Sequence, residues 1–242
     1  MTRRDGILRE MGLAPLWRLR DRPPAAEPEP VEIVTPPATI VAPAGDDRSR
    51  RIAAMDWDGL KTAVAACRDC RLCEQRKQAV LGVGDLEADW LFVGEGPGAE
   101  EDEKGEPFVG QAGKLLDAML TAIDLQRGRK VYIGNVVKCR PPGNRTPETE
   151  ETAACFPYLQ RQIELIRPKL IVALGKPAAE TLLDAEVKVG ASRGRLFDYR
   201  GIPLIVTYHP AYLLRSLPEK AKAWEDLCFA RRTMQGLSDV AR

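Results

Sequence analysis

The sequence predicts an α/β protein, a three-layer α/β/α sandwich around a central four-stranded, mostly parallel sheet. The first observation is a set of four short apolar runs, rich in β-branched residues, at residues 90–95, 131–137, 170–174 and 204–208. Runs that are apolar on both faces are typical of parallel strands covered by helices. The second observation is a set of helical patterns that alternate with these runs, at residues 114–124, 147–166, 176–184 and 219–235. Such alternation indicates helices on both faces of one sheet.

The second helical pattern has a recognisable start and an interruption. Thr146, Pro147 and Glu148 supply a cap, a proline at the first helical position and an early acid. Pro157 lies inside the pattern, where a proline removes a hydrogen bond and collides with the preceding turn. We therefore expect this helix to break or kink at Pro157.

Three segments divide the chain. Residues 1–22 place apolar side chains among arginines and form a short amphipathic element, a candidate interaction peptide. Residues 23–55 are rich in proline and alanine and cannot bury much surface, so we expect a flexible linker. Residues 56–242 contain all the strand and helix patterns and are expected to form the folded domain.

Composition excludes several classes of protein. The net charge is +1, so no global basic field indicates nucleic acid, and any DNA contact must come from local clusters. No apolar run approaches the roughly 20 residues of a membrane span, and charge interrupts the N-terminus too early for a signal peptide. We therefore expect a cytoplasmic protein. The single histidine, His209, excludes zinc sites built from several histidines.

The six cysteines are distributed unevenly. They comprise the triplet Cys67, Cys70 and Cys73, the later pair Cys139 and Cys155, and Cys228 alone. In a cytoplasmic protein they favour a metal or redox role over disulfides. A C-x2-C pair with two distant cysteines can form a four-thiolate site for zinc or an iron–sulfur cluster. Spacing alone chooses neither the metal nor the pair within the triplet, and we interpret Cys228 as a small buried hydrophobic residue.

A glycine-rich and acid-rich loop, GEGPGAEEDEKGEPFVGQAG, follows the first predicted strand and spans residues 94–113. Open α/β sheets place their ligand sites at such strand ends. The loop combines glycines, carboxylates and the ring of Phe108, which suit a flat, polar ring. It has neither the Walker nor the dinucleotide spacing of glycines, which argues against a phosphate loop.

Polar side chains end two other predicted strands. Asn135 ends the second strand, and His209 ends the fourth strand directly before Pro210. Taken alone, Phe108 reads as core packing, Asn135 as a turn-forming residue and His209 as a structural residue.

Five blocks of sequence carry a resemblance to a known family. They are C-x2-C-R-L from Cys67, GEGPG-x3-D-x2-G-x-PFVG-x-AG from Gly94, N-x2-KCRPP-x-NR-x-P from Asn135, Cys155, and HPAYLLR from His209. In this order they resemble the family 4 uracil-DNA glycosylases, the iron–sulfur branch of the uracil-DNA glycosylase superfamily. The resemblance covers roughly residues 60 to 232. It implies a DNA repair enzyme that flips uracil out of DNA, hydrolyses its N-glycosidic bond and leaves an abasic site.

The resemblance also implies a cofactor, a [4Fe-4S] cluster. The implied ligands are Cys67, Cys70, Cys139 and Cys155, with Cys73 outside the set. Because Cys139 and Cys155 bracket residues 140–147, the cluster would hold that loop toward DNA and play a structural role.

The family motifs imply roles for four side chains. Phe108 stacks on the flipped uracil, and the amide of Asn135 donates to O4 and accepts from N3–H. His209 donates to the negative charge that develops on O2. Glu95 orients the attacking water or stabilises the cationic sugar.

The glycine-rich loop has further implied roles. Backbone amides near Gly94 and Gly96 hold uracil or the water, and Glu101 crowds the C5 edge against thymine's methyl group. The other acids of the run are interpreted as solvated: Glu100, Asp102 and Glu103.

Contacts to the rest of the DNA are implied by the same blocks. Leu213 and Leu214 resemble the wedge that fills the gap left by the flipped base. The candidates for phosphate contacts are Lys138, Arg140, Arg145 and Arg215. One relative in the superfamily traps its substrate covalently through a histidine on an inserted loop. The corresponding loop here has no insertion and no histidine, so we expect the enzyme to release its product and turn over.

Residues 1–22 are similar to the N-terminal peptide of the psi subunit of the bacterial replicative clamp loader. We therefore expect this segment to bind a clamp-loader component, although packing on its own domain is an alternative. The chain is expected to be a monomer that acts on uracil-containing DNA, single- or double-stranded. Two other functions stay open: a uracil- or damage-binding protein without turnover, and a zinc-stabilised α/β protein of unrelated function.

Overall fold

The computed structural model describes residues 33–34 and 47–240. The predicted interaction peptide, residues 1–22, lies outside the described residues, as does most of the predicted linker. No described helix is both long and apolar enough to cross a membrane.

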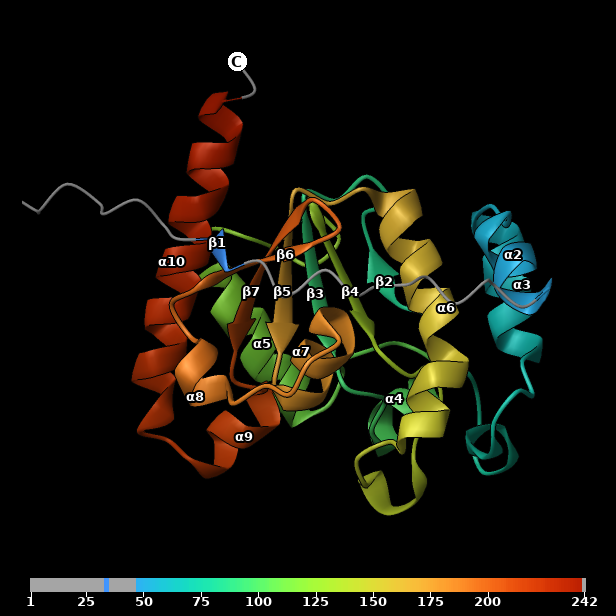
Figure 1. Ribbon diagram of the computed structural model, residues 1–242. Helices are drawn as coiled ribbons and strands as arrows, with labels where there is room; N and C mark the ends of the chain where they lie inside the picture. The colour runs from blue at the N-terminus through green and yellow to red at the C-terminus, as the bar shows by residue number, and fades with distance from the viewer. Residues whose placement is uncertain (1–32, 35–46, 241–242) are drawn as a thin grey trace, which may run out of the picture. The chain divides into compact units, whose positions relative to one another are not determined.

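One sheet organises the described domain (Figure 1). Its centre consists of the four predicted strands, now with observed bounds: β3 (Trp90–Gly94), β4 (Val131–Asn135), β5 (Leu170–Leu174) and β7 (Ile202–Thr207). They lie in the order β7-β5-β3-β4 and are all parallel to their neighbours. Their carboxyl ends therefore meet at one edge, where ligand sites of α/β proteins lie.

The predicted count of four strands needs correction, because the sheet has seven strands in the order β1-β6-β7-β5-β3-β4-β2. The additional strands are β1 (Ile33–Val34), β2 (Val83–Gly84) and β6 (Leu196–Tyr199). β2 and β6 pair antiparallel with β4 and β7, and β1 pairs parallel with β6. These additional strands have two to four residues, too few to produce a clear periodic pattern in the sequence.

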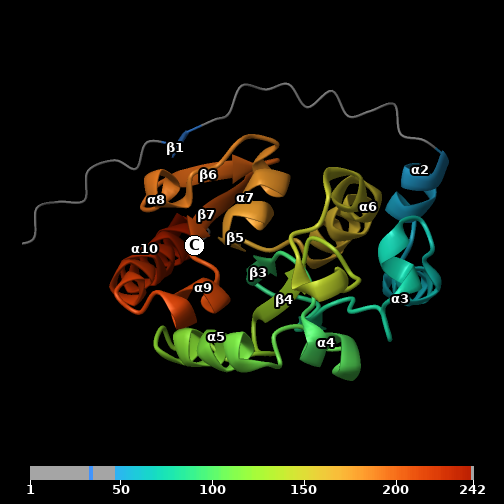
Figure 2. The same cartoon turned by 90° about the horizontal axis from the view of Figure 1, so that it is seen from below.

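Helices cover both faces of the sheet, which confirms the three-layer class. Figure 2 shows α5 (Gln111–Thr121) and α10 (Glu219–Val240) on one face, and α6 (Thr149–Ile166) and α7 (Lys176–Leu183) on the other. Alternate residues of each central strand enter the two layers. In β3, for example, Phe92 packs with α5 and α10, whereas Leu91 and Val93 pack with α6 and α7.

Shorter helices complete the domain. They are α2 (Asp47–Ala53), α3 (Trp57–Ala66), α4 (Ala99–Lys104), α8 (Val189–Ser192) and α9 (Pro210–Arg215), with 3-10 turns at Arg71–Glu74 and Pro142–Asn144. α4 and α9 follow β3 and β7, so both begin at the carboxyl edge of the sheet.

The predicted linker at residues 23–55 also needs correction, because β1 and α2 lie inside it. α2 packs on α6: Ile52 is buried, and the Arg48 guanidinium donates to the carbonyl of Ala154 at 2.8 Å. The same guanidinium lies 5.2 Å from the centre of the Tyr158 ring. The folded domain therefore extends before Asp56. The sequence of α2, DRSRRIA, has a single large apolar residue and hence no helical periodicity.

Helix α6 differs from its prediction at its first residue and at Pro157. It begins at Thr149 rather than at residue 147, and the Glu151 carboxylate accepts from the backbone N–H of Glu148 at 2.8 Å. The sequence predicts a break or a kink at Pro157; the helix continues through this residue, so the break is wrong and the kink stays a prediction. The carbonyl that loses its donor belongs to Ala153, an exposed residue where water can replace the missing N–H.

Candidate active site

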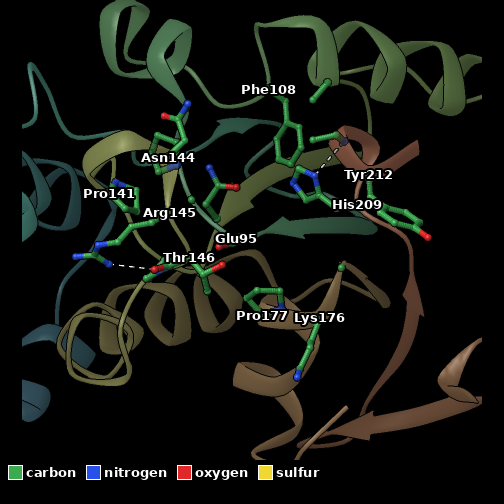
Figure 3. A pocket seen from close by; sticks show the side chains of 18 of the residues that line it. Glu95, Phe108, Pro141, Asn144, Arg145, Thr146, Lys176, Pro177, His209 and Tyr212 are labelled. Carbon is green, nitrogen blue, oxygen red and sulfur yellow. Dashed lines mark hydrogen bonds between the residues drawn. The ribbon is translucent and has the colours of Figure 1, made fainter. Parts of the chain in front are cut away.

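A cleft of about 630 Å³ lies at the carboxyl edge of the sheet (Figure 3). Its walls come from the loops after β3, β4 and β5 and from the junction of β7 with α9. The side chains that matter for its chemistry are Glu95, Phe108, Asn135, Thr146, His209 and Tyr212. The structure therefore brings together residues from segments that are more than a hundred positions apart in the chain.

The glycine-rich loop holds Phe108 in an unusual backbone conformation. Phe108 has φ of +55°, a left-handed value that is unfavourable for a bulky residue, and the residue is 6% exposed. A Cβ at Gly94 would lie 2.5 Å from both the Phe108 ring and the Asn135 Oδ1 atom. Glycine at position 94 is thus what lets the ring and the amide lie next to the β3 backbone.

Asn135 presents a buried amide with an unused acceptor. It ends β4, is 2% exposed, and its Oδ1 atom has no hydrogen-bond partner among the described residues. Buried polar atoms are normally paired, so an unpaired one in a cleft indicates a partner that arrives with a ligand. A hydrogen bond fixes the backbone of Asn135: the Lys138 Nζ atom donates to the Asn135 carbonyl at 2.6 Å.

His209 has a defined tautomer in its neutral form. It precedes α9 as the N-cap residue, and its Nδ1 atom accepts the backbone N–H of Ala211 at 3.1 Å. The proton of the neutral ring is therefore on Nε2, which is left as a donor. Burial, followed by the charge of Arg215, lowers the pKa of His209 to about 4 against the opposing charge of Glu101. At pH 7 the ring is a neutral N–H donor, with its centre 5.5 Å from the centre of the Phe108 ring.

Glu95 and Glu101, the two carboxylates of the cleft lining, have different surroundings. Burial raises the pKa of Glu95, and a hydrogen bond with the Thr146 side chain opposes this shift. Glu101 instead serves the loop, because its oxygens accept the backbone N–H groups of Gly98, Val109 and Gly110 at 2.9 to 3.1 Å. Glu95 is thus the carboxylate of the lining that is available for chemistry.

The acidic run after Gly98 is solvated only in part. Glu100 and Glu103 are exposed, as the interpretation of the run requires. Asp102 is 2% exposed, and its carboxylate accepts the backbone N–H of Lys77 at 2.9 Å. The interpretation is therefore wrong for Asp102, which ties α4 to the segment that follows the cysteine triplet.

The two predicted wedge residues, Leu213 and Leu214, lie on different sides of α9, one buried and one exposed. Leu213 is 1% exposed and packs in the core, so its prediction as a wedge is wrong, whereas Leu214 is 41% exposed. Pro210 and Leu213 form the buried side of α9, which turns Tyr212 and Leu214 outward. Sequence reasoning missed Tyr212, which lines the cleft and is 38% exposed. Its ring stacks on that of Tyr208, with 5.2 Å between the ring centres. The three-residue spacing of Pro210 and Leu213 is the signal that could have identified it.

The four predicted phosphate contacts lie in different environments. Arg215 and Arg145 line the cleft. Arg145 also forms a two-pronged ion pair with the buried Glu151 carboxylate, at 2.6 and 2.8 Å, and the Arg140 Nε atom donates to Asn144 at 2.7 Å. Lys138 is 1% exposed, so its prediction as a phosphate contact is wrong.

A second, small cavity is lined by five of the cysteines. They are Cys67, Cys70, Cys73, Cys139 and Cys155. Two sulfur atoms accept hydrogen bonds: Cys139 from the Arg76 guanidinium at 2.8 Å and Cys155 from the backbone N–H of Lys138 at 3.2 Å. Within residues 33–34 and 47–240, no group of three or more histidine, cysteine or acidic residues has metal-binding geometry. The cavity nevertheless gathers the four predicted ligands, together with Cys73.

The fold and the cleft define an α/β protein with a candidate binding site at the carboxyl edge of its sheet. The model of the uracil DNA glycosylase superfamily matches residues 81–228. This match covers more than half of the chain and includes the four central strands, the glycine-rich loop and the His209 segment, so the chain belongs to the uracil DNA glycosylase superfamily.

Three similar proteins are type-4 uracil-DNA glycosylases. The protein from Pyrobaculum aerophilum is 43% identical over 182 residues, which cover 72% of this chain and 92% of the relative. The protein from Thermotoga maritima is 48% identical over 155 residues, covering 63% of this chain and 80% of the relative. The protein from Archaeoglobus fulgidus is 46% identical over 165 residues, covering 65% of this chain and 82% of the relative.

Proposed function

We propose that this chain is a uracil-DNA glycosylase, which turns uracil out of DNA and hydrolyses the bond between the base and the deoxyribose. The observation that supports this most strongly is the meeting of Phe108, Asn135 and His209 in one cleft. They offer a ring face, a buried amide and a neutral N–H donor. The names of the similar proteins support the same activity.

Recognition of uracil rests on Asn135 and Phe108. The unpaired Oδ1 atom accepts N3–H of the base, and the Nδ2 atom donates to O4. Cytosine offers the reverse pattern of donor and acceptor and is rejected. The Phe108 ring stacks on the base, an interaction worth about 1–3 kcal/mol, which offsets part of the unstacking of the DNA.

Departure of the base rests on His209. As the bond between N1 and C1′ breaks, its electron pair leaves with uracil, and negative charge grows on O2. The Nε2–H donor of His209 stabilises that charge without first needing a proton from solution, because the pKa of about 4 keeps the ring neutral.

Attack by water rests on Glu95. The sugar gains positive charge at C1′, and the half-buried carboxylate stabilises this charge or accepts a proton from the water whose oxygen bonds to C1′. Backbone amides near Gly94 and Gly96 hold the uracil or the water. Glu101 blocks the C5 methyl of thymine, in a position that its three backbone hydrogen bonds keep rigid.

Contacts along the DNA come from α9 and from the loop after β4. Leu214 takes the role of wedge, since it is exposed on α9. Arg215, Arg145 and Arg140 bind phosphates, which position the strand without reading its sequence.

The cysteine cavity holds a [4Fe-4S] cluster through Cys67, Cys70, Cys139 and Cys155. Four thiolates are the usual ligand set of such clusters, and the Arg76 and Lys138 N–H groups suit negatively charged sulfur. When bound, the cluster supplies structural cross-links. Cys139 and Cys155 then fix both ends of the loop that carries Arg140 and Arg145.

Three further proposals concern the chain in the cell. It acts as a monomer in the cytoplasm, and residues 1–22 bind a clamp-loader component. This segment lies outside the described residues, so the proposal rests on its sequence; binding of a peptide of residues 1–25 to clamp-loader components would test it.

Base release from a single-stranded oligonucleotide with one labelled uracil tests the activity. The proposal predicts free uracil and alkali-sensitive strands with uracil DNA, and neither with the matched thymine or cytosine oligonucleotide. A gel shift specific to uracil DNA without release would instead indicate a binding protein. If a folded protein gave no release and no gel shift, the choice of substrate would be overturned.

A further inference from the structure

The backbone of Phe108 is held by residues outside the cleft lining. Its carbonyl oxygen would lie 1.8 Å from a Cβ at position 113, so only glycine fits there. The left-handed φ of Phe108 is unfavourable by itself and persists only where surrounding contacts impose it. Something besides the glycines must therefore fix this carbonyl.

Arg127 provides that contact. Its Nη2 atom donates to the Phe108 carbonyl at 2.7 Å, and its Nη1 atom donates to the Pro107 carbonyl at 2.8 Å. Its Nε and Nη2 atoms also donate to the Asp117 carboxylate of α5 at 3.1 and 3.0 Å, and its Nη1 atom donates to the Glu106 carboxylate at 3.4 Å. The side chain is 19% exposed and lies outside the cleft lining.

We propose that Arg127 is a positioning residue for catalysis, which fixes the ring face of Phe108 against the flipped base by clamping two successive carbonyls to α5. The inference rests on the proposed function. A planar guanidinium with five donors can bind both carbonyls and the Asp117 carboxylate at once, whereas the ammonium of lysine has no such fork.

The clamp acts on catalysis only through the Phe108 ring. Without it, the backbone of residues 107 and 108 is free to leave the left-handed conformation, and the ring no longer lies between Gly94 and His209. The other groups of the cleft keep their own supports, such as the Ala211 contact of His209. Loss of the clamp should therefore remove the stacking contribution and little else.

A double-mutant cycle tests this, with single-turnover uracil release and thermal melting measured for each protein. Arg127→Met keeps the aliphatic stem and removes the fork, and Arg129→Met is the matched control at an exposed arginine two positions later. We expect Arg127→Met to slow release by about tenfold, as loss of one stacking contact does, and Arg129→Met to change it by less than about twofold. In a Phe108→Ala background, Arg127→Met should have less than about a twofold further effect.

Equal slowing by Arg127→Met in both backgrounds would overturn the proposal, because Arg127 would then act through overall stability. If Arg127→Met does not fold, Arg127→Lys replaces it in the same cycle, with the same expected coupling to Phe108. Hydrogen exchange of the peptide that covers residues 107–113 should rise in the Arg127 variant only, and unchanged exchange would also count against the clamp. Failure of the wild type to release uracil would contradict the proposed function, while the exchange measurement still reports on the clamp.

Discussion

The Lys138 ammonium group donates to the backbone carbonyl of Asn135 at 2.6 Å, inside the protein. The backbone N–H of the same lysine donates to the Cys155 sulfur atom at 3.2 Å. One residue thus joins the end of β4, where the base is read, to the cysteine cavity. Through this connection, a change in the position of Cys155 can alter the position of Asn135 in the cleft.

Replacement of the buried lysine should therefore slow catalysis. In Lys138→Met the carbonyl of Asn135 loses a charged donor, and we expect uracil release to fall by about tenfold or more, the size of one such hydrogen bond. Single-turnover release is the measurement, with Lys61→Met, an exposed lysine of α3, as the control. Equal rates for the two variants would show that the connection has no role.

The single histidine allows a direct test of its charge state. Because burial depresses the pKa of His209 to about 4, the ring should stay neutral as the pH falls from 8 to 5. NMR titration of its ring protons should show no midpoint near the ordinary value of about 6.5. On acidification, the activity should first fall with protonation of Glu95, whose pKa burial raises. A histidine midpoint near 6.5 would contradict this account of the donor.

Gly94 should tolerate no side chain. In Gly94→Ala the new Cβ displaces Phe108 or Asn135, and we expect uracil release to fall on the order of 100-fold, as for a misplacement of about 1 Å. Gly236→Ala is the control, since a Cβ there meets nothing within 4 Å and the residue lies in α10. Retention of wild-type rates in Gly94→Ala would mean that the ring and amide do not need their observed positions.

The ligand set of the cluster can be separated from the other cysteines by absorbance and iron content. We expect Cys155→Ser to lose the visible iron–sulfur absorbance and Cys228→Ser, outside the cavity, to keep it. Cys73→Ser should also keep it, although Cys73 lines the cavity. Loss of absorbance in Cys73→Ser would place that thiol in the ligand set, and a colourless wild type containing zinc would contradict the cluster.

The central part of the fold could be predicted from the sequence because it depends on local patterns. The four central strands coincide with clear apolar runs, and the predicted and observed bounds agree to within about two residues. The three additional strands and α2 escape prediction because they are short or have a single large apolar residue, so they depend on neighbours that only the tertiary structure supplies.

The sequence predicts those residues of the site that lie in recognisable motifs. The blocks around Gly94, Asn135 and His209 lie far apart in the chain but meet in one cleft. The orientation of Leu213, in contrast, depends on how α9 packs, and the burial of Lys138 opposes the usual exposure of lysine. Arg127 belongs to no motif, and only its contacts reveal it.

The most direct test of the account is single-turnover uracil release by the wild type, Asn135→Ala and His209→Ala, each checked for folding by thermal melting. The account predicts a loss of about 10² to 10³-fold for His209→Ala, as for removal of one preorganised donor, and at least about tenfold for Asn135→Ala. Folded variants that release uracil at the wild-type rate would contradict the claim that this cleft reads and releases the base.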